Sequence, residues 1–358
     1  MRKIFVSMLM VMVLCACAHA DLIYTTTAGG MGVVRINGES ADLRGIQYTG
    51  SSDTLMASYW DGSASRVILV NRTTDTTTSG DTAQIFSPSN LTAPLNTEPV
   101  ILEGAYNIQA IASTYAGRSI YAASGASIRE FRTDGFARVR SYTCKPESGD
   151  TQAPAVKDII TARYVVNVLA EYENSGDVLL RFDGQLRDDI EDFAVWKVPS
   201  GTTAITYTNT SRLIAAHETG VALLGGSSFD KIVSTDSPVK AVCPDNDSGF
   251  YFTDGTTLMH YSDGKTTNLL TVSSGTECRL ASDTDNGVFG AVLGGKLYVY
   301  AMKNNVLMGE YDASALGGSP RDIAFGTVSG EDSSSDSSGC SSCGIEMLLL
   351  SVLFLKRR

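Results

Sequence analysis

Short runs of alternating apolar and polar residues recur along this chain, and two-residue turns separate many of them. Turn pairs that tolerate a positive φ, such as Asn37-Gly38, Asp134-Gly135 and Asp254-Gly255, suit tight hairpins. Alternation with a period of two is typical of β-strands with one buried face, and no comparable stretch has helical spacing. The pattern therefore predicts an all-β chain built from antiparallel hairpins.

One motif, a polar or basic entry followed by an alternating apolar run, occurs seven times. Its copies are Leu43-Arg44-Gly45-Ile46, Ile108-Gln109-Ala110-Ile111, Val156-Lys157-Asp158-Ile159, Thr203-Ala204-Ile205-Thr206, Val239-Lys240-Ala241-Val242, Cys278-Arg279-Leu280-Ala281 and the segment 319–326. Units of roughly 35 to 65 residues with several short strands are typical of β-propellers, in which each unit forms a four-stranded blade. The chain resembles a generic seven-bladed β-propeller, and a six- or eight-bladed ring stays open.

The last copy of the motif has no following strands of its own, because a Ser/Asp/Gly-rich segment comes after it. At the other end, segments 22–26 and 32–36 form a hairpin-like pair that lacks an inner strand. We therefore expect 321–327 to pair with the N-terminal hairpin and close the ring. Closure leaves only short, protected strand edges.

The composition fits one large domain flanked by terminal signals. Hydrophobic residues make up 43% of the 358 residues and charged residues 19%, so the chain can bury a sizeable core. The sequence predicts a signal peptide at 1–20, a propeller at 21–330, a Ser/Gly/Asp/Cys stalk at 331–344 and a hydrophobic-basic tail at 345–358.

The N-terminus has the order of a secretory signal. Arg2 and Lys3 precede an apolar run, and small residues end at Ala20, after which we expect cleavage. The run is shorter than the roughly 20 residues that span a bilayer. Leu14-Cys15-Ala16-Cys17 also resembles a lipobox, in which Cys17 would carry a lipid, and this alternative stays open.

The C-terminus combines a polar spacer, the element Gly339-Cys340-Ser341-Ser342-Cys343-Gly344, an apolar run at 347–355 and a terminal basic cluster. This order resembles the bacterial C-terminal sorting signals that carry a Cys, of the Synergist type and its relatives. The resemblance implies a processing protease acting near Cys340 and Cys343, and retention at the cell surface or outer membrane, or release. A second Cys and a short apolar run depart from the pattern, so an uncleaved anchor stays open.

Charge and motif content argue against several function classes. The net charge of −11 repels phosphate backbones, so we expect no nucleic-acid partner. His217 and His260 lie in strand-like runs without a recognisable triad. The odd number of Cys in the predicted domain, namely Cys144, Cys243 and Cys278, argues against a disulfide framework, and Cys243 and Cys278 are expected to be small core residues. The loops 245–249 and 283–287 have calcium-like donors but lack the final Glu of an EF-hand. We expect no metal and no cofactor.

The repeat itself supplies the candidate site. Five polar or basic residues fall at or near the first positions of the predicted inner strands, with Arg279 as a possible sixth: Arg44, Gln109, Lys157, Lys240 and Arg321. In a propeller these strands line the central channel, so positive charge would gather at one mouth and could hold an anionic ligand such as a uronate. The alternative is that each pairs with a neighbouring carboxylate such as Asp158 or Asp322.

The sequence therefore predicts an exported, surface-retained binding or scaffolding module rather than an enzyme. Its partner would be a glycan or an envelope protein, with membrane contact only through the termini. A polysaccharide lyase or glycosidase stays open, and would need two carboxylates about 5 to 10 Å apart in one pocket. A lipidated envelope-assembly propeller anchored through Cys17 is the third possibility.

Overall fold

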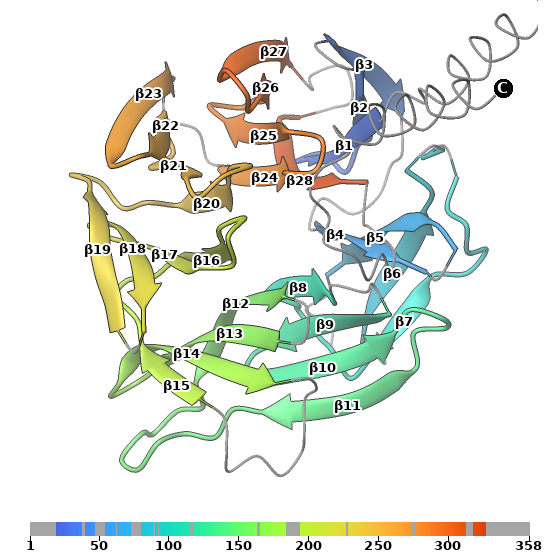
Figure 1. The fold of residues 1–358 in the computed structure, drawn as a ribbon. Helices are drawn as coiled ribbons and strands as arrows, with labels where there is room; N and C mark the ends of the chain where they lie inside the picture. Colours follow the sequence, from blue (N-terminus) through green and yellow to red (C-terminus); the bar gives the residue numbers. More distant parts are fainter. Residues whose placement is uncertain are drawn as a thin grey trace, which may run out of the picture.

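The computed structural model describes residues 19–37, 40–46, 54–61, 63–72, 80–88, 90–91, 93–114, 118–162, 165–183, 194–226, 228–273, 277–312 and 318–326. These residues form 28 strands in seven four-stranded antiparallel sheets, and they form no helix that could cross a membrane. The sheets stand around one central axis as the blades of a propeller (Figure 1). The predicted all-β fold and the count of seven blades are confirmed.

Blade 1 joins the two ends of the described chain. Its strands lie in the spatial order β28 (Pro320–Phe325), β1 (His19–Thr26), β2 (Met31–Asn37) and β3 (Ser40–Ile46). Leu22 pairs with Phe325 and Tyr24 pairs with Ile323 in the antiparallel register. The predicted closure of the ring by the C-terminal inner strand is therefore confirmed.

The other six blades follow the chain from an inner strand at the axis to an outer strand at the rim (Figure 1). Blade 2 contains β4 (Thr54–Trp60), β5 (Ser65–Asn71), β6 (Gly80–Phe86) and β7 (Val100–Glu103). Blade 3 contains β8 (Ala110–Ser113), β9 (Ser119–Ser124), β10 (Ser127–Arg132) and β11 (Arg138–Thr143). Blade 4 contains β12 (Ala155–Ala162), β13 (Val165–Tyr172), β14 (Gly176–Asp183) and β15 (Ala194–Lys197). Blade 5 contains β16 (Ala204–Tyr207), β17 (Leu213–His217), β18 (Gly220–Gly225) and β19 (Ser228–Ser234). Blade 6 contains β20 (Ala241–Pro244), β21 (Phe250–Thr253), β22 (Thr257–Ser262) and β23 (Lys265–Thr271). Blade 7 contains β24 (Arg279–Asp283), β25 (Val288–Leu293), β26 (Lys296–Ala301) and β27 (Val306–Tyr311).

One of the seven motif copies was assigned to the wrong strand. The segment 43–46 lies on β3, the outermost strand of blade 1, where Arg44 pairs with Val33 of β2. The inner strand of blade 2 is β4 instead, which contacts β28 on one side and β8 on the other. A basic residue followed by apolar alternation occurs equally well on an outer strand, so the motif alone could not separate the two.

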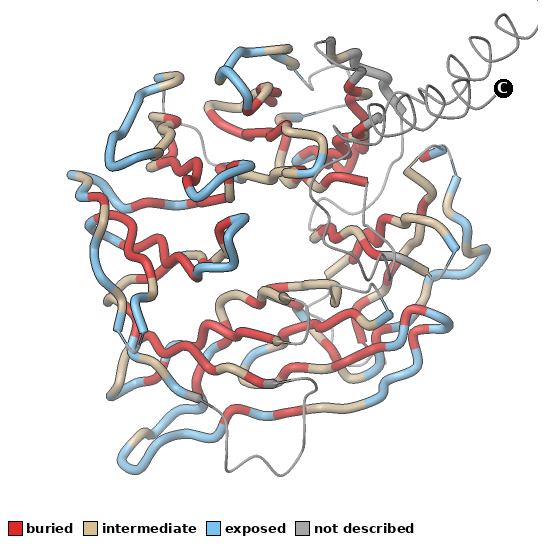
Figure 2. Tube along the Cα trace, in the orientation of Figure 1, coloured by how far each residue is buried: buried red, intermediate tan, exposed pale blue. Residues whose placement is uncertain are grey.

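The hydrophobic core lies between the blades rather than at the axis. Seven clusters of buried residues occur among the described residues, and each joins the facing sheets of two adjacent blades. The middle strands carry most of this burial, whereas the outer strands and turns are exposed (Figure 2). Because every blade depends on both neighbours, the closed ring buries apolar surface that an open one would leave in water.

Buried aspartates fix the chain where it passes from one blade to the next. Asp81 on β6 is fully buried and accepts hydrogen bonds from the amides of Asn107 (3.1 Å) and Ile108 (2.9 Å). Asp177 on β14 accepts one from the amide of Thr202 at 2.9 Å. Each carboxylate satisfies backbone donors in a linker that belongs to no sheet ladder, and so positions the following inner strand.

Candidate functional site

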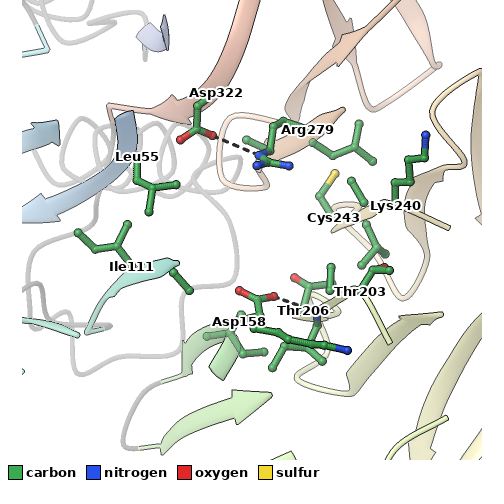
Figure 3. Close-up of a pocket in the computed structure, with 18 of the residues that line it drawn as sticks. Leu55, Ile111, Asp158, Thr203, Thr206, Lys240, Cys243, Arg279 and Asp322 are labelled. Atoms are coloured by element: carbon green, nitrogen blue, oxygen red, sulfur yellow. Dashed lines mark hydrogen bonds and ion pairs between the residues drawn. The ribbon is translucent and has the colours of Figure 1, made fainter. Parts of the chain in front are cut away.

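The candidate site is a cavity of about 590 Å³ on the propeller axis. All seven inner strands contribute to its lining, from β4 through β28. Its charged lining residues are Lys157, Asp158, Lys240, Arg279 and Asp322. Figure 3 shows Asp322 and Arg279 facing each other on one side of the cavity, with Asp158 on the opposite side.

Asp158 and Asp322 occupy equivalent places in blades 4 and 1. Asp158 accepts hydrogen bonds from the amides of Ile159 (2.9 Å) and of Ile205 on β16 (3.1 Å). Asp322 in the same way accepts from Ile323 (3.0 Å) and from Met56 on β4 (3.0 Å). Each carboxylate therefore ties its inner strand to that of the next blade, and both line the cavity.

Both carboxylates hold protons more readily than ordinary aspartates. Burial raises the pKa of Asp158 from 3.8 to about 6, although the Ile205 and Ile159 amides and the charge of Arg279 act against it. Burial also raises the pKa of Asp322, against the charge of Arg279 and two backbone amides. Desolvation disfavours the charged form of a carboxyl group, and here it outweighs the surrounding donors.

Arg279 is the cation that faces the cavity. It lies at the first position of β24, and its side chain is 49% exposed. The guanidinium donates to the carbonyl of Cys278 at 3.0 Å, and its Nε lies 3.8 Å from Asp322 Oδ1. A half-exposed guanidinium held by one long ion pair keeps donors for a planar anionic group.

Lys157 lines the cavity but is paired with carboxylates of its own blade. It is the extra residue of a β-bulge, since Val156 pairs with Ala170 and Asp158 with Leu169. Its Nζ lies 2.6 Å from Asp177 and 3.1 Å from Glu171. Burial lowers the pKa of this ammonium, but the two carboxylates outweigh burial and the net pKa is raised. The expected pairing occurs with these residues and not with Asp158.

Lys240 and Gln109 also line the cavity, and both contact their own blades. Lys240 is exposed and forms no ion pair within the described part of the chain, and its side chain lies over Gly255. Gln109 accepts a hydrogen bond from the amide of Gly125 at 2.8 Å.

The structure does not bring the remaining predicted residues to the cavity. Arg321 is the bulged residue of β28, skipped between Pro320 and Asp322 in the pairing with β1, and it is not among the lining residues. Arg44 lies on the outer strand β3. Ala20 is buried within β1, whereas Cys17, Cys340 and Cys343 lie outside the described residues. The expected ring of positive charge is thus reduced to Arg279, with Lys240 beside it.

The histidines belong to packed networks. His260 Nε2 and a carboxyl oxygen of Asp245 form a hydrogen bond of 2.9 Å, and Nδ1 lies 3.1 Å from the side-chain amide nitrogen of Asn305. The imidazole also stacks on Tyr251, with ring centroids 4.4 Å apart. His217 is buried, and burial lowers its pKa. These contacts account for His260, whereas Nε2 of His217 is buried without a hydrogen-bond partner among the described residues.

The aspartates of the two calcium-like loops cap their own turns. Asp245 accepts from the Asp247 amide at 2.8 Å, and Asp283 accepts from the Asn286 amide at 3.0 Å. Within the described ranges no three potential metal ligands converge. Cys243 and Cys278 are buried free thiols, as expected of small core residues, and Cys144 is a third.

A second cavity of about 440 Å³ lies at the other end of the inner strands. Hydroxyl and amide groups dominate its polar lining, including Ser113, Thr161, Asn209 and Thr284. Thr206 lines both cavities, so the two adjoin along the axis. The sequence motif gave no indication of this end, because its polar residues follow the apolar run instead of opening it.

Comparisons with known proteins support the fold. No family model and no curated protein sequence matches the chain. A protein from Lactobacillus plantarum is similar in structure, with a TM-score of 0.63 and 14% identity. So are a candidate 6-phosphogluconolactonase from Bacteroides uniformis (0.62, 13%) and a protein of unknown function from Desulfotomaculum acetoxidans (0.57, 11%). Each match covers 86% of this chain and 99% of the other, and at such identities the likeness concerns the fold.

Proposed function

We propose that this chain is an exported β-propeller that binds an acidic carbohydrate, such as a uronate-containing glycan, in its axial cavity. The observation that carries the proposal is the position of Arg279 in a cavity whose walls also present the carboxyls of Asp158 and Asp322. A half-exposed guanidinium suits a sugar carboxylate, and carboxyl groups held by backbone amides suit sugar hydroxyls. The adjoining hydroxyl-rich cavity offers contacts for a second, neutral sugar unit.

Binding is favoured over catalysis because both aspartates are held between blades. Each carboxyl accepts two backbone hydrogen bonds, and these would have to break before the group could move toward a substrate. No His, Ser or Cys nucleophile with an adjacent base lies among the lining residues. A rigid ring with fixed polar groups is suited to recognition.

Hydrolysis is the second candidate, and one observation favours it. Asp158 has a pKa of about 6 and lines the cavity, so near neutral pH it could exchange a proton with a bound sugar. A relative in structure is a candidate 6-phosphogluconolactonase. Incubation with uronate polymers and sugar lactones, followed by detection of released product, would favour this candidate if Asp158→Asn abolished turnover.

The terminal signals supply the cellular part of the proposal. The apolar segment ending at Ala20 would direct export, and the tail from Cys340 onward would hold the protein at the surface through a sorting protease. Cell fractionation tests this directly: the full chain should label on intact cells, and a chain ending at residue 338 should appear in the medium. Labelling with palmitate that is lost in Cys17→Ala would instead support the lipidated alternative.

A glycan panel tests the ligand class. The chain should bind polymers of uronic acid and should not bind the same polymers after chemical reduction of their carboxyl groups. Arg279→Gln should lose this binding, whereas Lys265→Gln, the same charge change on the exposed outer strand β23, should keep it. Equal binding to the reduced polymers would exclude a role for the sugar carboxylate.

A further inference from the structure

Two arginines of blade 3 lie on the same face of their sheet because of a β-bulge. In the register of β10 with β11, Glu130 pairs with Arg140, but Phe131 pairs with Arg138. Val139 is therefore skipped, and Arg138 moves to the face that carries Arg129 and Phe131. Glu130, the acid of this hairpin ladder, lies on the opposite face.

This face looks toward blade 2. Phe131 belongs to the hydrophobic cluster between blades 2 and 3, whereas Ile128 and Tyr142, on the other face, belong to the cluster between blades 3 and 4. Arg129 and Arg138 therefore lie at the junction where blade 2 ends and blade 3 begins. Asp81 fixes the chain at this junction through the amide of Asn107.

The two guanidinium groups converge on Gly104. A Cβ atom on Gly104 would lie 3.3 Å from Arg129 Nε and 3.3 Å from Arg138 Nη1. Gly104 has a φ of +75°, a conformation that L side chains rarely adopt, and the two guanidinium groups occupy the space that a side chain here would take. Two positive charges therefore pack side by side against bare backbone.

No carboxylate compensates these charges within the described part of the chain. Neither Arg129 nor Arg138 forms an ion pair there, and the Nε and Nη1 atoms of Arg129 are buried without a hydrogen-bond partner. Burial lowers the pKa of Arg129, and the neighbouring Arg138 lowers it further. Two like charges brought together with unsatisfied donors are costly unless an anion joins them.

We propose that this blade junction is an oxyanion site, in which Arg129 and Arg138 hold a sulfate or phosphate group near Gly104. Arg138 is exposed and gives access from solvent, and Arg129 supplies the inner wall. The group could be a free ion or an ester on a larger molecule. The site is separate from the axial cavity, and its test does not depend on the carbohydrate proposal.

The test is a sulfate titration of the full chain at constant ionic strength, balanced with sodium chloride and followed by thermal unfolding. Sulfate stabilises many proteins without binding, but that effect is not saturable. We expect a saturable rise in the melting temperature on top of it, and the same with phosphate. Arg129→Gln and Arg138→Gln should each raise the sulfate concentration at half-saturation at least about tenfold, because each removes a charge-assisted hydrogen bond.

Arg132→Gln is the matched control. Arg132 lies on the same strand and is 61% exposed in an ion pair with Asp134, so its loss should leave the half-saturation unchanged. If Arg129→Gln loses the circular dichroism of the native protein, Arg138→Gln decides, since its exposed side chain carries little packing. A saturable response of equal strength in wild type and Arg138→Gln would overturn the proposal. To distinguish a free ion from an ester, sulfated and phosphorylated monosaccharides are titrated in the same assay. A higher half-saturation concentration for these esters than for the inorganic ions would favour the free ion.

Discussion

The carboxyl group of Asp322 accepts a hydrogen bond from the amide of Met56 at 3.0 Å, although 266 positions separate the two residues. The bond joins β28, the last strand of the ring, to β4, the inner strand of the next blade. Asp158 makes the same bond to Ile205 at 3.1 Å between blades 4 and 5. The walls of the cavity are therefore built from the groups that hold adjacent blades together.

Asp322→Asn should destabilise the closed ring. Asparagine has one acceptor oxygen where the carboxylate has two, so either Met56 or Ile323 would lose its hydrogen-bond acceptor. We expect the free energy of unfolding to fall by about 1–3 kcal/mol, measured by urea denaturation. Asp263→Asn, in an exposed turn with φ of 52°, is the matched control and should change stability little. Equal stability of the two variants would show that the Asp322 bonds contribute nothing.

Asp158 should titrate near pH 6. Because the folded protein binds this proton more tightly than the unfolded chain, the stability it contributes is present below pH about 4 and is lost as pH rises through about 6. Asp61 and Asp254 have lowered pKa values and act in the opposite direction, so the contribution is isolated by comparison with Asp158→Asn. Carboxyl carbon NMR should show an inflection near 6 that the variant lacks, and an inflection near 4 would refute the prediction.

The contact between Asp245 and His260 should be structural. Asp245 is 3% exposed and bonds both His260 and the Asp247 amide, so Asp245→Ala leaves two polar groups without a partner. We expect a loss of about 1–3 kcal/mol in the free energy of unfolding. Asp247→Ala removes an exposed carboxylate from the same loop and should be close to wild type. Denaturation midpoints that do not differ would argue against this network as a source of stability.

The core thiols should resist alkylation in the folded protein. Burial raises the pKa of Cys278 to about 11 and that of Cys144 to about 12, and it raises the pKa of Cys243 as well. Thiolates are the reactive species, so these groups should react only after unfolding. Peptide mapping after iodoacetamide treatment, with and without urea, checks this. Modification of Cys278 in native buffer would mean that the chain before β24 opens.

The repeat in the sequence was sufficient for the fold, including closure through the two ends of the domain. Turn pairs and alternating runs are local signals, and six of the seven motif copies fall on inner strands. The copy at Leu43 failed because an outer strand can carry the same alternation as an inner one. Its spacing to the next copy was the longest in the series, and the true inner strand β4 lies closer to that next copy.

The site was harder to predict because side-chain direction depends on bulges. Lys157 and Arg321 are both bulged residues, and in each case the following aspartate lines the cavity. The same limitation concealed the pair formed by Arg129 and Arg138, which a regular ladder would place on opposite faces. A one-residue change of register is not visible in a periodic pattern.

The most direct measurement of the central claim is calorimetric titration of the chain with a uronic acid oligomer at pH 7. We expect saturable binding to wild type, loss of at least about tenfold in affinity in Arg279→Gln, and no loss in Lys265→Gln. The carboxyl-reduced oligomer should bind to none of them. Undiminished binding to Arg279→Gln, or equal binding of the reduced oligomer, would contradict the account of the axial cavity as a site for acidic carbohydrate.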